Sequence, residues 1–393
     1  MRLAVAALVG VVACHGGDDA GDDAPSAPLV VAAPTAPATT TLAPAMPPKK
    51  PSWSFVVLSD LHLPNPKREV IDHILTAIIA MSPRPRFVIL AGDHTNGNPW
   101  NPPALVAGSI YWWKVVAAAL QPLRDAHIPV LPVAGNHDSY LPGQRAHYAA
   151  TFDLKAWAAP FEVHGAVARG EIGAPPFSYG VDVDDVHFSF VHNVQEWLDK
   201  DVASWLADDL ADASKARIRI VVSHAPWHTV IAHERTQFAA QMGGILEGGN
   251  ANLYLSGHEH LFWDEDFALP HGHTLRQVMT GCVSGWYNYG PNKDELAAAH
   301  CTKIVVPGKV APLACAMPHG GGAFMLALDH HNREIEHARI ELTVITVPPD
   351  GTAVEATPMT LDATNKLVPW YLGAEPHADQ RGDSQRGSSG STR

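Results

Sequence analysis

The residues of this 393-residue chain that are best suited to chemistry lie in five short clusters of aspartate, histidine and asparagine. Each cluster directly follows an apolar run with the character of a β-strand. Loops at the ends of strands are where α/β proteins place their functional side chains. We therefore expect the clusters to meet at one site. They are Asp60-Leu61-His62, Gly92-Asp93, Gly135-Asn136-His137-Asp138, His224 and Gly257-His258-Glu259-His260.

The side chains in these clusters favour a transition-metal site. Imidazole nitrogens combined with carboxylate and amide oxygens suit Mn, Fe, Zn or Co better than calcium. In an extended chain residues i and i+2 point to the same side, so Asp60 with His62, and His258 with His260, can each direct two groups into one small volume. The set is too large for one ion. Two divalent cations would outweigh the aspartates of the set and leave a positive pocket, which suits a phosphoryl group.

The ordered set D-x-H, G-D, G-N-H-D, H and G-H-x-H resembles the motifs of the calcineurin-like metallophosphoesterases, over roughly Trp53 to Val347. The resemblance implies an α/β fold, a four-layer α/β/β/α sandwich of two mixed β-sheets flanked by helices. It also implies a dinuclear metal centre whose ligands are divided between two ions. These are Asp60, His62 and His260 on one metal, Asn136, His224 and His258 on the other, and Asp93 as the bridge.

The same resemblance implies an enzyme that hydrolyses a small phosphate ester, either a phosphodiester or a phosphomonoester, with a hydroxide activated by the two metals. His137 is then expected to stabilise the phosphoryl oxygens or protonate the leaving group, with Asp138 holding its imidazole. His94, next to the bridging position, is more typical of a packing residue than of a substrate contact. The alternative is a catalytically weak metal-binding lipoprotein that acts as a binding or scaffold module.

Two departures from relatives narrow the subfamily. Asn96 stands where purple acid phosphatases have a tyrosine ligand, three residues after the second-motif aspartate. Serine/threonine protein phosphatases have D-R-G after the second motif and an arginine before G-N-H. This chain has Asn96-Gly97-Asn98 and Ala134 at the corresponding positions. We therefore expect a bacterial phosphomonoesterase or phosphodiesterase rather than a member of either group.

The N-terminal residues are typical of an exported protein. Met1-Arg2 precedes an apolar run, residues 3–13, that is too short to span a bilayer but fits a signal peptide. Val11-Val12-Ala13-Cys14 resembles a bacterial lipobox in which Cys14 becomes lipidated; the alternative is an ordinary signal peptide with an incidental Cys14. Residues 14–52, rich in Ala, Pro and Thr, predict a disordered tether. We expect a lipoprotein that faces the periplasm or cell exterior and contacts the membrane through its lipid anchor alone.

Composition bounds the remaining possibilities. The net charge of −13 and the pI of 5.9 disfavour a nucleic-acid binder, and no obligate protein partner is evident. We expect one catalytic domain over 53–347, with a loop-like excursion at about 282–322, and a largely disordered tail over 348–393. Cys301 and Cys315 are the expected disulfide pair within the excursion; the alternative is that they and Cys282 all remain thiols.

Hydrophobic periodicity predicts the elements that carry the clusters. Apolar stripes at helical spacing predict three helices, over 67–81, 111–126 and 199–213. Alternation within 177–191 predicts a strand pair with a turn at Asp184-Asp185. Later strands are expected over 274–280, 323–328 and 334–347, the last two joined by a turn at 330–332. Alternating strands and helices followed by strands predict two packed sheets with helices outside.

Overall fold

The computed structural model describes residues 51–64, 68–97, 102–140, 142–165, 174–193, 198–229, 236–260, 262–283, 300–303, 313–316, 323–326 and 342–370. The chain divides into two units, Met1–Pro48 and Lys49–Arg393, and the described residues belong to the second. The predicted signal peptide, Cys14 and nearly all of the predicted tether lie outside them. Among the described residues, none of the helices has both the length and the apolar character that a bilayer crossing requires.

The first sheet has six strands in the order β16-β15-β14-β1-β2-β3. Strands β1, β2 and β3 are parallel, and the other neighbours are antiparallel. The strands are β1 Trp53–Leu58, β2 Val88–Ala91, β3 Val130–Val133, β14 Leu342–Val347, β15 Glu355–Leu361 and β16 Leu367–Pro369. Helices α1 (Arg68–Ile79) and α2 (Pro102–Asp125) connect the three parallel strands.

The second sheet has ten strands in the order β11-β12-β13-β9-β10-β8-β7-β6-β5-β4. Strands β6, β7, β8 and β10 run parallel to their neighbours within that set. The strands are β4 Val163–Gly165, β5 Tyr179–Val183, β6 Val186–Val191, β7 Ile218–Ser223, β8 Leu253–Ser256, β9 Phe262–Ala268, β10 Thr274–Met279, β11 His300–Lys303, β12 Leu313–Ala316 and β13 Ala323–Leu326. The other helices are α3 Asn136–Ser139, α4 Pro142–Thr151, α5 Leu154–Trp157, α6 Lys200–Asp212, η2 Ala213–Lys215 and α7 Thr236–Gly248.

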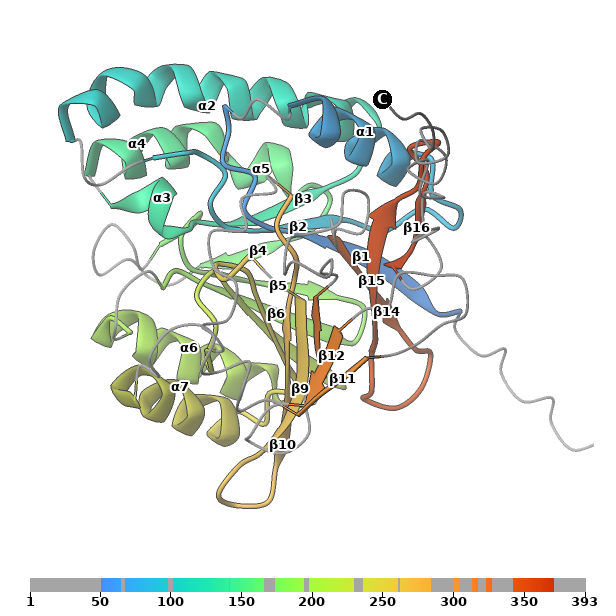
Figure 1. Cartoon of the computed structure of the whole chain (residues 1–393). Helices are drawn as coiled ribbons and strands as arrows, with labels where there is room; N and C mark the ends of the chain where they lie inside the picture. The colour runs from blue at the N-terminus through green and yellow to red at the C-terminus, as the bar shows by residue number, and fades with distance from the viewer. Residues whose placement is uncertain are drawn as a thin grey trace, which may run out of the picture. The chain divides into compact units, whose positions relative to one another are not determined.

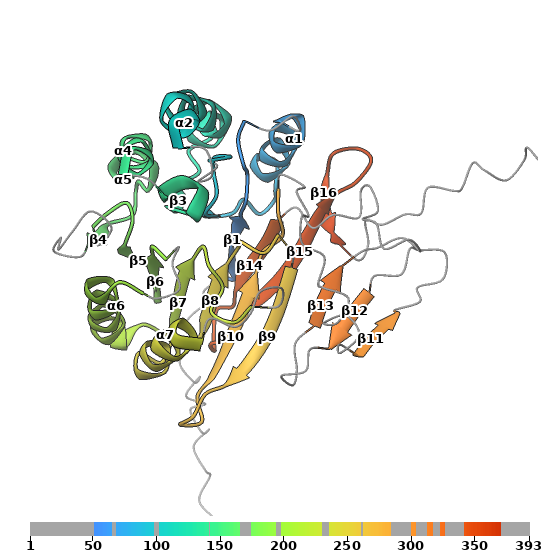
Figure 2. The ribbon, with the colours of Figure 1, turned by 60° about the vertical axis from the view of Figure 1, so that its left-hand side comes forward.

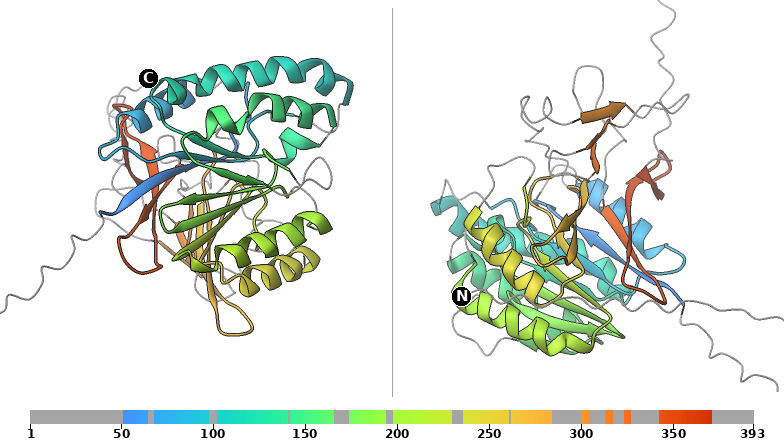
Figure 3. Two further views of the ribbon diagram at one scale, coloured as in Figure 1. Left: turned by 180° about the vertical axis from the view of Figure 1, so that it is seen from behind. Right: turned by 90° about the horizontal axis from the view of Figure 1, so that it is seen from below.

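The two sheets pack face to face, and helices cover both outer faces (Figure 1). Between the sheets, the rings of Phe55 and Phe87 stack at 5.0 Å and meet Phe188 of the second sheet edge-on at 5.4 Å. Helices α1 and α2 lie over the first sheet, and α6 and α7 lie over the second (Figure 2). The apolar stripe of each helix is buried against its sheet. The layering is also seen from behind and from below (Figure 3). The predicted four-layer sandwich is confirmed.

Parallel pairing explains why the clusters meet. The carboxyl ends of β1, β2 and β3 lie at one edge of the first sheet, and those of β7 and β8 lie at one edge of the second. Each of these strands is followed by one of the five clusters. The site is therefore built across the two sheets, from loops that rigid, buried strands hold in place.

The end of the chain differs from the sequence prediction. We expected the packed domain to stop at Val347, but β15 and β16 extend the first sheet, with Met359, Leu361 and Trp370 buried. The proline and threonine content of this stretch resembles a linker, although its apolar residues alternate as in a strand. Packing therefore continues at least to Trp370, and residues 371–393 lie outside the described part.

The late strands belong to different sheets. Strand β13 joins β9 and β12 in the second sheet, whereas β14 lies between β1 and β15 in the first. The expected turn at 330–332 lies outside the described residues. Alternating apolar residues identify a strand but not the strand it pairs with. The apolar residues of β13 and β14 suit either sheet equally. The excursion over 282–322 is likewise more than a loop, because it contains β11 and β12. Strand β9 and helix α7 were not predicted from the sequence.

Candidate metal centre

The loops that carry the ligands are sharp turns rather than the extended segments that we expected. Their backbone lies in the left-handed region, which costs about 1–3 kcal/mol for a residue other than glycine. Such conformations persist only where the surrounding structure enforces them, and they cluster at functional sites. The residues are Asp60 (φ 57°), His62 (φ 44°), Asp93 (φ 52°), His258 (φ 76°) and His260 (φ 57°).

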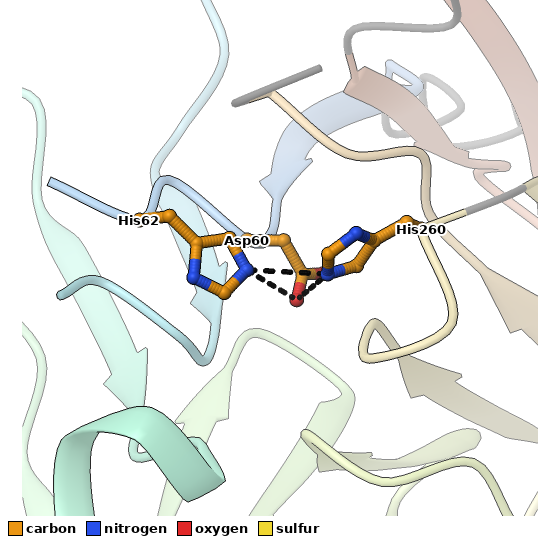
Figure 4. A group of neighbouring side chains, drawn as sticks. All are labelled: Asp60, His62 and His260. Carbon is orange, nitrogen blue, oxygen red and sulfur yellow. Dashed lines mark hydrogen bonds and ion pairs between the residues drawn. The ribbon is translucent and has the colours of Figure 1, made fainter. Parts of the chain in front are cut away.

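The first ligand group joins the end of β1 to the loop after β8 (Figure 4). Oδ1 of Asp60 lies 3.2 Å from Nε2 of His260 and 3.7 Å from Nε2 of His62, and these two nitrogens are 3.2 Å apart. The other carboxylate oxygen, Oδ2, accepts hydrogen bonds from the Ser59 hydroxyl at 2.5 Å and from the backbone N–H of His258 at 3.0 Å. The carboxylate is thus held so that Oδ1 faces the two imidazoles.

The second group adjoins the first through Asp93. Oδ2 of Asp93 lies 3.2 Å from Nε2 of His224 and 3.9 Å from Nε2 of His62. The same His224 nitrogen is 3.0 Å from Oδ1 of Asn136 and 3.2 Å from Nδ1 of His258. The structure therefore brings all the predicted ligands together in two adjoining groups, with Asp93 between them. The spacing of His258 and His260 suggested that both point into one small volume, which is wrong. Each belongs to a different group, as the family resemblance implied.

Hydrogen bonds behind the ligands turn the correct atoms inward. Nδ1 of His224 donates to the carbonyl of Ala91 at 2.8 Å, which leaves Nε2 to face the group. The amide nitrogen of Asn136 donates to the hydroxyl of Tyr140 at 3.0 Å, which turns Oδ1 towards His224. Such outer contacts are how proteins orient metal ligands. The donor atoms, nitrogen and oxygen in mixed groups, fit two transition-metal ions.

The charges of the site also fit cations. Burial by itself would raise the pKa of Asp60 and Asp93, but the neighbouring histidines outweigh it and hold the pKa of both carboxyls well below the usual range. Burial would lower the pKa of His224 and His260, but Asp93 raises the first to about 9 and Asp60 raises the second to about 12. The buried carboxylates thus require positive charge, which protons provide until metal ions replace them.

His137 lies at the rim of the centre. Its side chain is 26% exposed, and its Nε2 is 3.9 Å from Oδ2 of Asp93. Its ring meets that of His62 edge-on at 4.9 Å. The backbone N–H of His137 donates to Oδ1 of Asp93 at 2.8 Å, so the same carboxylate fixes the turn from which His137 projects. This histidine can therefore reach both the centre and a molecule that approaches from solvent.

Asp138 does not hold the imidazole of His137, as we had expected. Its Oδ2 accepts from Nδ1 of His94 at 2.7 Å, from the His94 backbone at 3.1 Å and from Gly135 N–H at 3.0 Å. Its Oδ1 accepts from the backbone N–H of Thr95 at 3.0 Å and from its hydroxyl at 3.2 Å. Asp138 therefore ties the loop after β2 to the loop after β3.

His94 is a packing residue, as the sequence favoured. Its side chain is fully buried, and its ring lies 5.0 Å from that of Phe152 and 5.9 Å from that of Tyr148. One face of the loop after β2 is thereby sealed by aromatic rings, while its other face presents Asp93.

Close approach to the carboxylates requires glycine at positions 135 and 257. A Cβ on Gly135 would overlap Oδ1 and the backbone of Asp93, and a Cβ on Gly257 would overlap the hydroxyl of Ser59 and lie 2.8 Å from Oδ2 of Asp60. A side chain at either position would displace a metal-facing carboxylate.

Sequence reasoning missed three residues behind the ligands. Ser59 orients Asp60, and Tyr140 orients Asn136. Cys282, a buried thiol, lies with its sulfur 3.5 Å from the carbonyl of Asp60, and its side chain hydrogen-bonds His260. Only Tyr140 carried a usable signal, because it follows Asn136 by four residues on a helical turn.

Comparisons with known proteins found a matching family model and several similar solved structures. A family model described as calcineurin-like phosphoesterase matches residues 54–262. The purple acid phosphatase PPD1 from yellow lupin (Lupinus luteus) seeds aligns with a TM-score of 0.50 at 11% identity, covering 82% of this chain and 52% of that one. GAP50, the anchor in the inner membrane complex of Plasmodium, aligns with a TM-score of 0.47 at 14% identity, covering 84% and 88%.

A 5'-nucleotidase precursor from Thermus thermophilus aligns with a TM-score of 0.38 at 12% identity, covering 79% of this chain and 55% of that one. The chain thus spans about half the length of the lupin and Thermus proteins. No curated protein sequence matches it.

Proposed function

Because the chain belongs to the calcineurin-like phosphoesterase family, we propose that it is a hydrolase that cleaves a small phosphate ester at the two adjoining ligand groups. The observation that carries the proposal is the sharing of Asp93. One of its oxygens lies within 3.9 Å of imidazole nitrogens from both groups, His62 and His224. That arrangement supports two metal ions held side by side by one carboxylate.

Asp60, His62 and His260 would hold one metal ion, Asn136, His224 and His258 the other, and Asp93 would bridge them. When bound, such a pair polarises a phosphoryl oxygen and makes water nucleophilic near neutral pH. The chain's own contribution at the rim is His137. Its partly exposed imidazole can donate a hydrogen bond to a phosphoryl oxygen or a proton to the departing alkoxide. Attack by water in line predicts inversion at phosphorus and no phosphoenzyme.

The test compares bis(p-nitrophenyl) phosphate with p-nitrophenyl phosphate after chelator treatment and addition of Mn or Zn. We expect activity to return only with metal, and the preferred ester to distinguish a diesterase from a monoesterase. His137→Asn should keep its metals and lose about 100-fold or more in kcat, whereas Asp93→Asn should bind less metal. His164→Asn, at a half-exposed position on β4, is the control. Full metal occupancy without turnover of either ester would instead support the binding or scaffold module.

We also propose that the protein is an exported lipoprotein, anchored through Cys14. The lipobox-like Val11-Val12-Ala13-Cys14 and the apolar run before it support this. Cys14→Ala should abolish labelling with a radioactive fatty acid and release the protein from the membrane fraction. A variant that remains lipid-labelled would refute the assignment of the anchor.

A further inference from the structure

Tyr140 stands at the end of the one-turn helix α3, four residues after the metal-facing Asn136. Residues i and i+4 of a helix lie above one another, so the phenol can reach back along the turn. Its hydroxyl accepts a hydrogen bond from the amide nitrogen of Asn136 at 3.0 Å. The amide oxygen is thereby turned towards His224, 3.0 Å away. The side chain thus acts on a ligand without being one.

The ring of Tyr140 is also open to solvent beside His137. The residue is 40% exposed, and its ring centroid lies 6.1 Å from that of His137, with the planes at 66°. The other large apolar residues exposed among the described residues, Ile110 and Tyr111, lie on helix α2. Among the described residues, Tyr140 is therefore the large exposed aromatic that adjoins the rim of the metal centre.

This placement matters because of where a substrate's organic group must lie. If the phosphoryl group faces the ligand groups and His137 reaches the leaving oxygen, the alcohol attached to that oxygen extends past His137 towards solvent. Tyr140 borders His137 on this exposed side. A flat apolar group there can lie against the phenol ring, in an offset or edge-on contact.

We propose that Tyr140 determines specificity and positions Asn136: it selects phosphate esters with a planar aromatic organic group, such as aryl or nucleoside phosphates, over esters of small polar alcohols. The inference rests on the proposed function, since it places substrate at the same site. The two parts of the side chain have separate tasks. The ring contacts the organic group, and the hydroxyl fixes the ligand amide.

The experiment separates substrate preference from turnover by using phosphonates that cannot be hydrolysed. Binding of phenylphosphonate and methylphosphonate to the Mn-loaded protein is measured by calorimetry, alongside Mn binding itself. Tyr140→Phe keeps the ring and removes the hydroxyl, whereas Tyr140→Leu removes both. Tyr111→Leu, at a position 61% exposed on α2, is the matched control. Circular dichroism of each variant confirms that it is folded.

We expect the wild-type protein to bind phenylphosphonate about 3- to 10-fold more tightly than methylphosphonate. Tyr140→Phe should keep that ratio but bind one of two Mn ions about 10-fold more weakly, the range typical for loss of an outer contact. Tyr140→Leu should lose the ratio as well, and its KM for p-nitrophenyl phosphate should rise while that for glycerol 2-phosphate changes little.

An unchanged phenyl preference in Tyr140→Leu, or none in the wild-type protein, would overturn the specificity assignment. Mn affinity unchanged in Tyr140→Phe would overturn the positioning role. Failure of the proposed function looks different, because the Mn-loaded wild-type protein would then bind neither phosphonate and hydrolyse neither ester.

Discussion

Replacing Asp138 by asparagine tests whether this residue holds loops or assists catalysis. Whichever oxygen becomes an amide nitrogen, at least one buried backbone donor loses its acceptor. The less costly orientation gives up Oδ1, which orphans the N–H of Thr95 and leaves Oδ2 to accept from His94 and Gly135. An orphaned buried donor costs about 1–3 kcal/mol, and each hydrogen bond to a charged group is worth about 1.5–3 kcal/mol.

We therefore expect Asp138→Asn to lower the free energy of unfolding by about 3–5 kcal/mol, which corresponds to a melting temperature about 5 to 8 °C lower for a domain of this size. Thermal and urea unfolding measure this in chelator, so that metal release does not contribute. Metal affinity should also fall, because both ligand loops loosen. The pH dependence of kcat should keep its shape, since the structure gives Asp138 no contact with the His137 imidazole.

Asp72→Asn is the matched control, a carboxylate paired with Arg68 and 51% exposed on helix α1. It should change stability by less than about 1 kcal/mol. The positioning role of Asp138 would be refuted by a variant with normal melting temperature and metal affinity but an altered pH profile of kcat. That result would restore the role in which Asp138 holds the imidazole of His137.

Further outcomes follow from the same structure. Metal binding at pH 7.5 should release about two protons, from His224 and His260, because their pKa values are raised to about 9 and about 12. Metal affinity should therefore fall as the pH falls. Calorimetry in buffers of different ionisation enthalpy counts the released protons. Burial lowers the pKa of His192 to about 4, so the folded state keeps it neutral while the unfolded chain takes up a proton below pH 6.5. The contribution of His192 to the free energy of unfolding is present above pH 6.5, and about 2 kcal/mol of it is lost between pH 7.5 and 5.0. Urea unfolding in chelator measures this loss, which the His192→Gln variant should not show. The β11–β12 register places Cys301 opposite Cys315, and the Cα atoms of such a cross-strand pair are close enough for a disulfide. The number of cysteines that are alkylated should therefore rise by two after reduction. Equal labelling before and after reduction would show that both are thiols.

The meeting of the candidate ligands could be predicted from the sequence because each one lies just after its strand. An apolar run followed by an aspartate or histidine is a local pattern, and parallel pairing then brings the ends of those strands together. The partner of a side chain is not local in this way. Asp138 adjoins His137 in sequence, yet it turns to His94, which lies on another loop. The choice depends on donors that only the folded structure collects around the carboxylate.

The fold shows the same division between local and distant information. Periodicity predicted α1, β5 and β6 near their observed bounds, since each buries one face of a regular element. The choice between the two sheets for β13 and β14 could not be predicted, because both runs present apolar residues suited to either core. Strand β15 escaped recognition because Pro358 and the threonines around it resemble a linker, although the strand pairs antiparallel with both β14 and β16.

The strained turns and the charges of the metal centre have a common consequence. Five ligands hold left-handed backbone conformations, and imidazole nitrogens such as those of His62 and His260 are packed 3.2 Å apart. Without cations, protonated histidines offset the negative charge of the carboxylates, and these histidines repel one another. The rest of the sandwich must therefore stabilise a geometry that is unfavourable on its own. Cations that bind only the folded site repay that free energy, so metal occupancy and the stability of both ligand loops are thermodynamically linked.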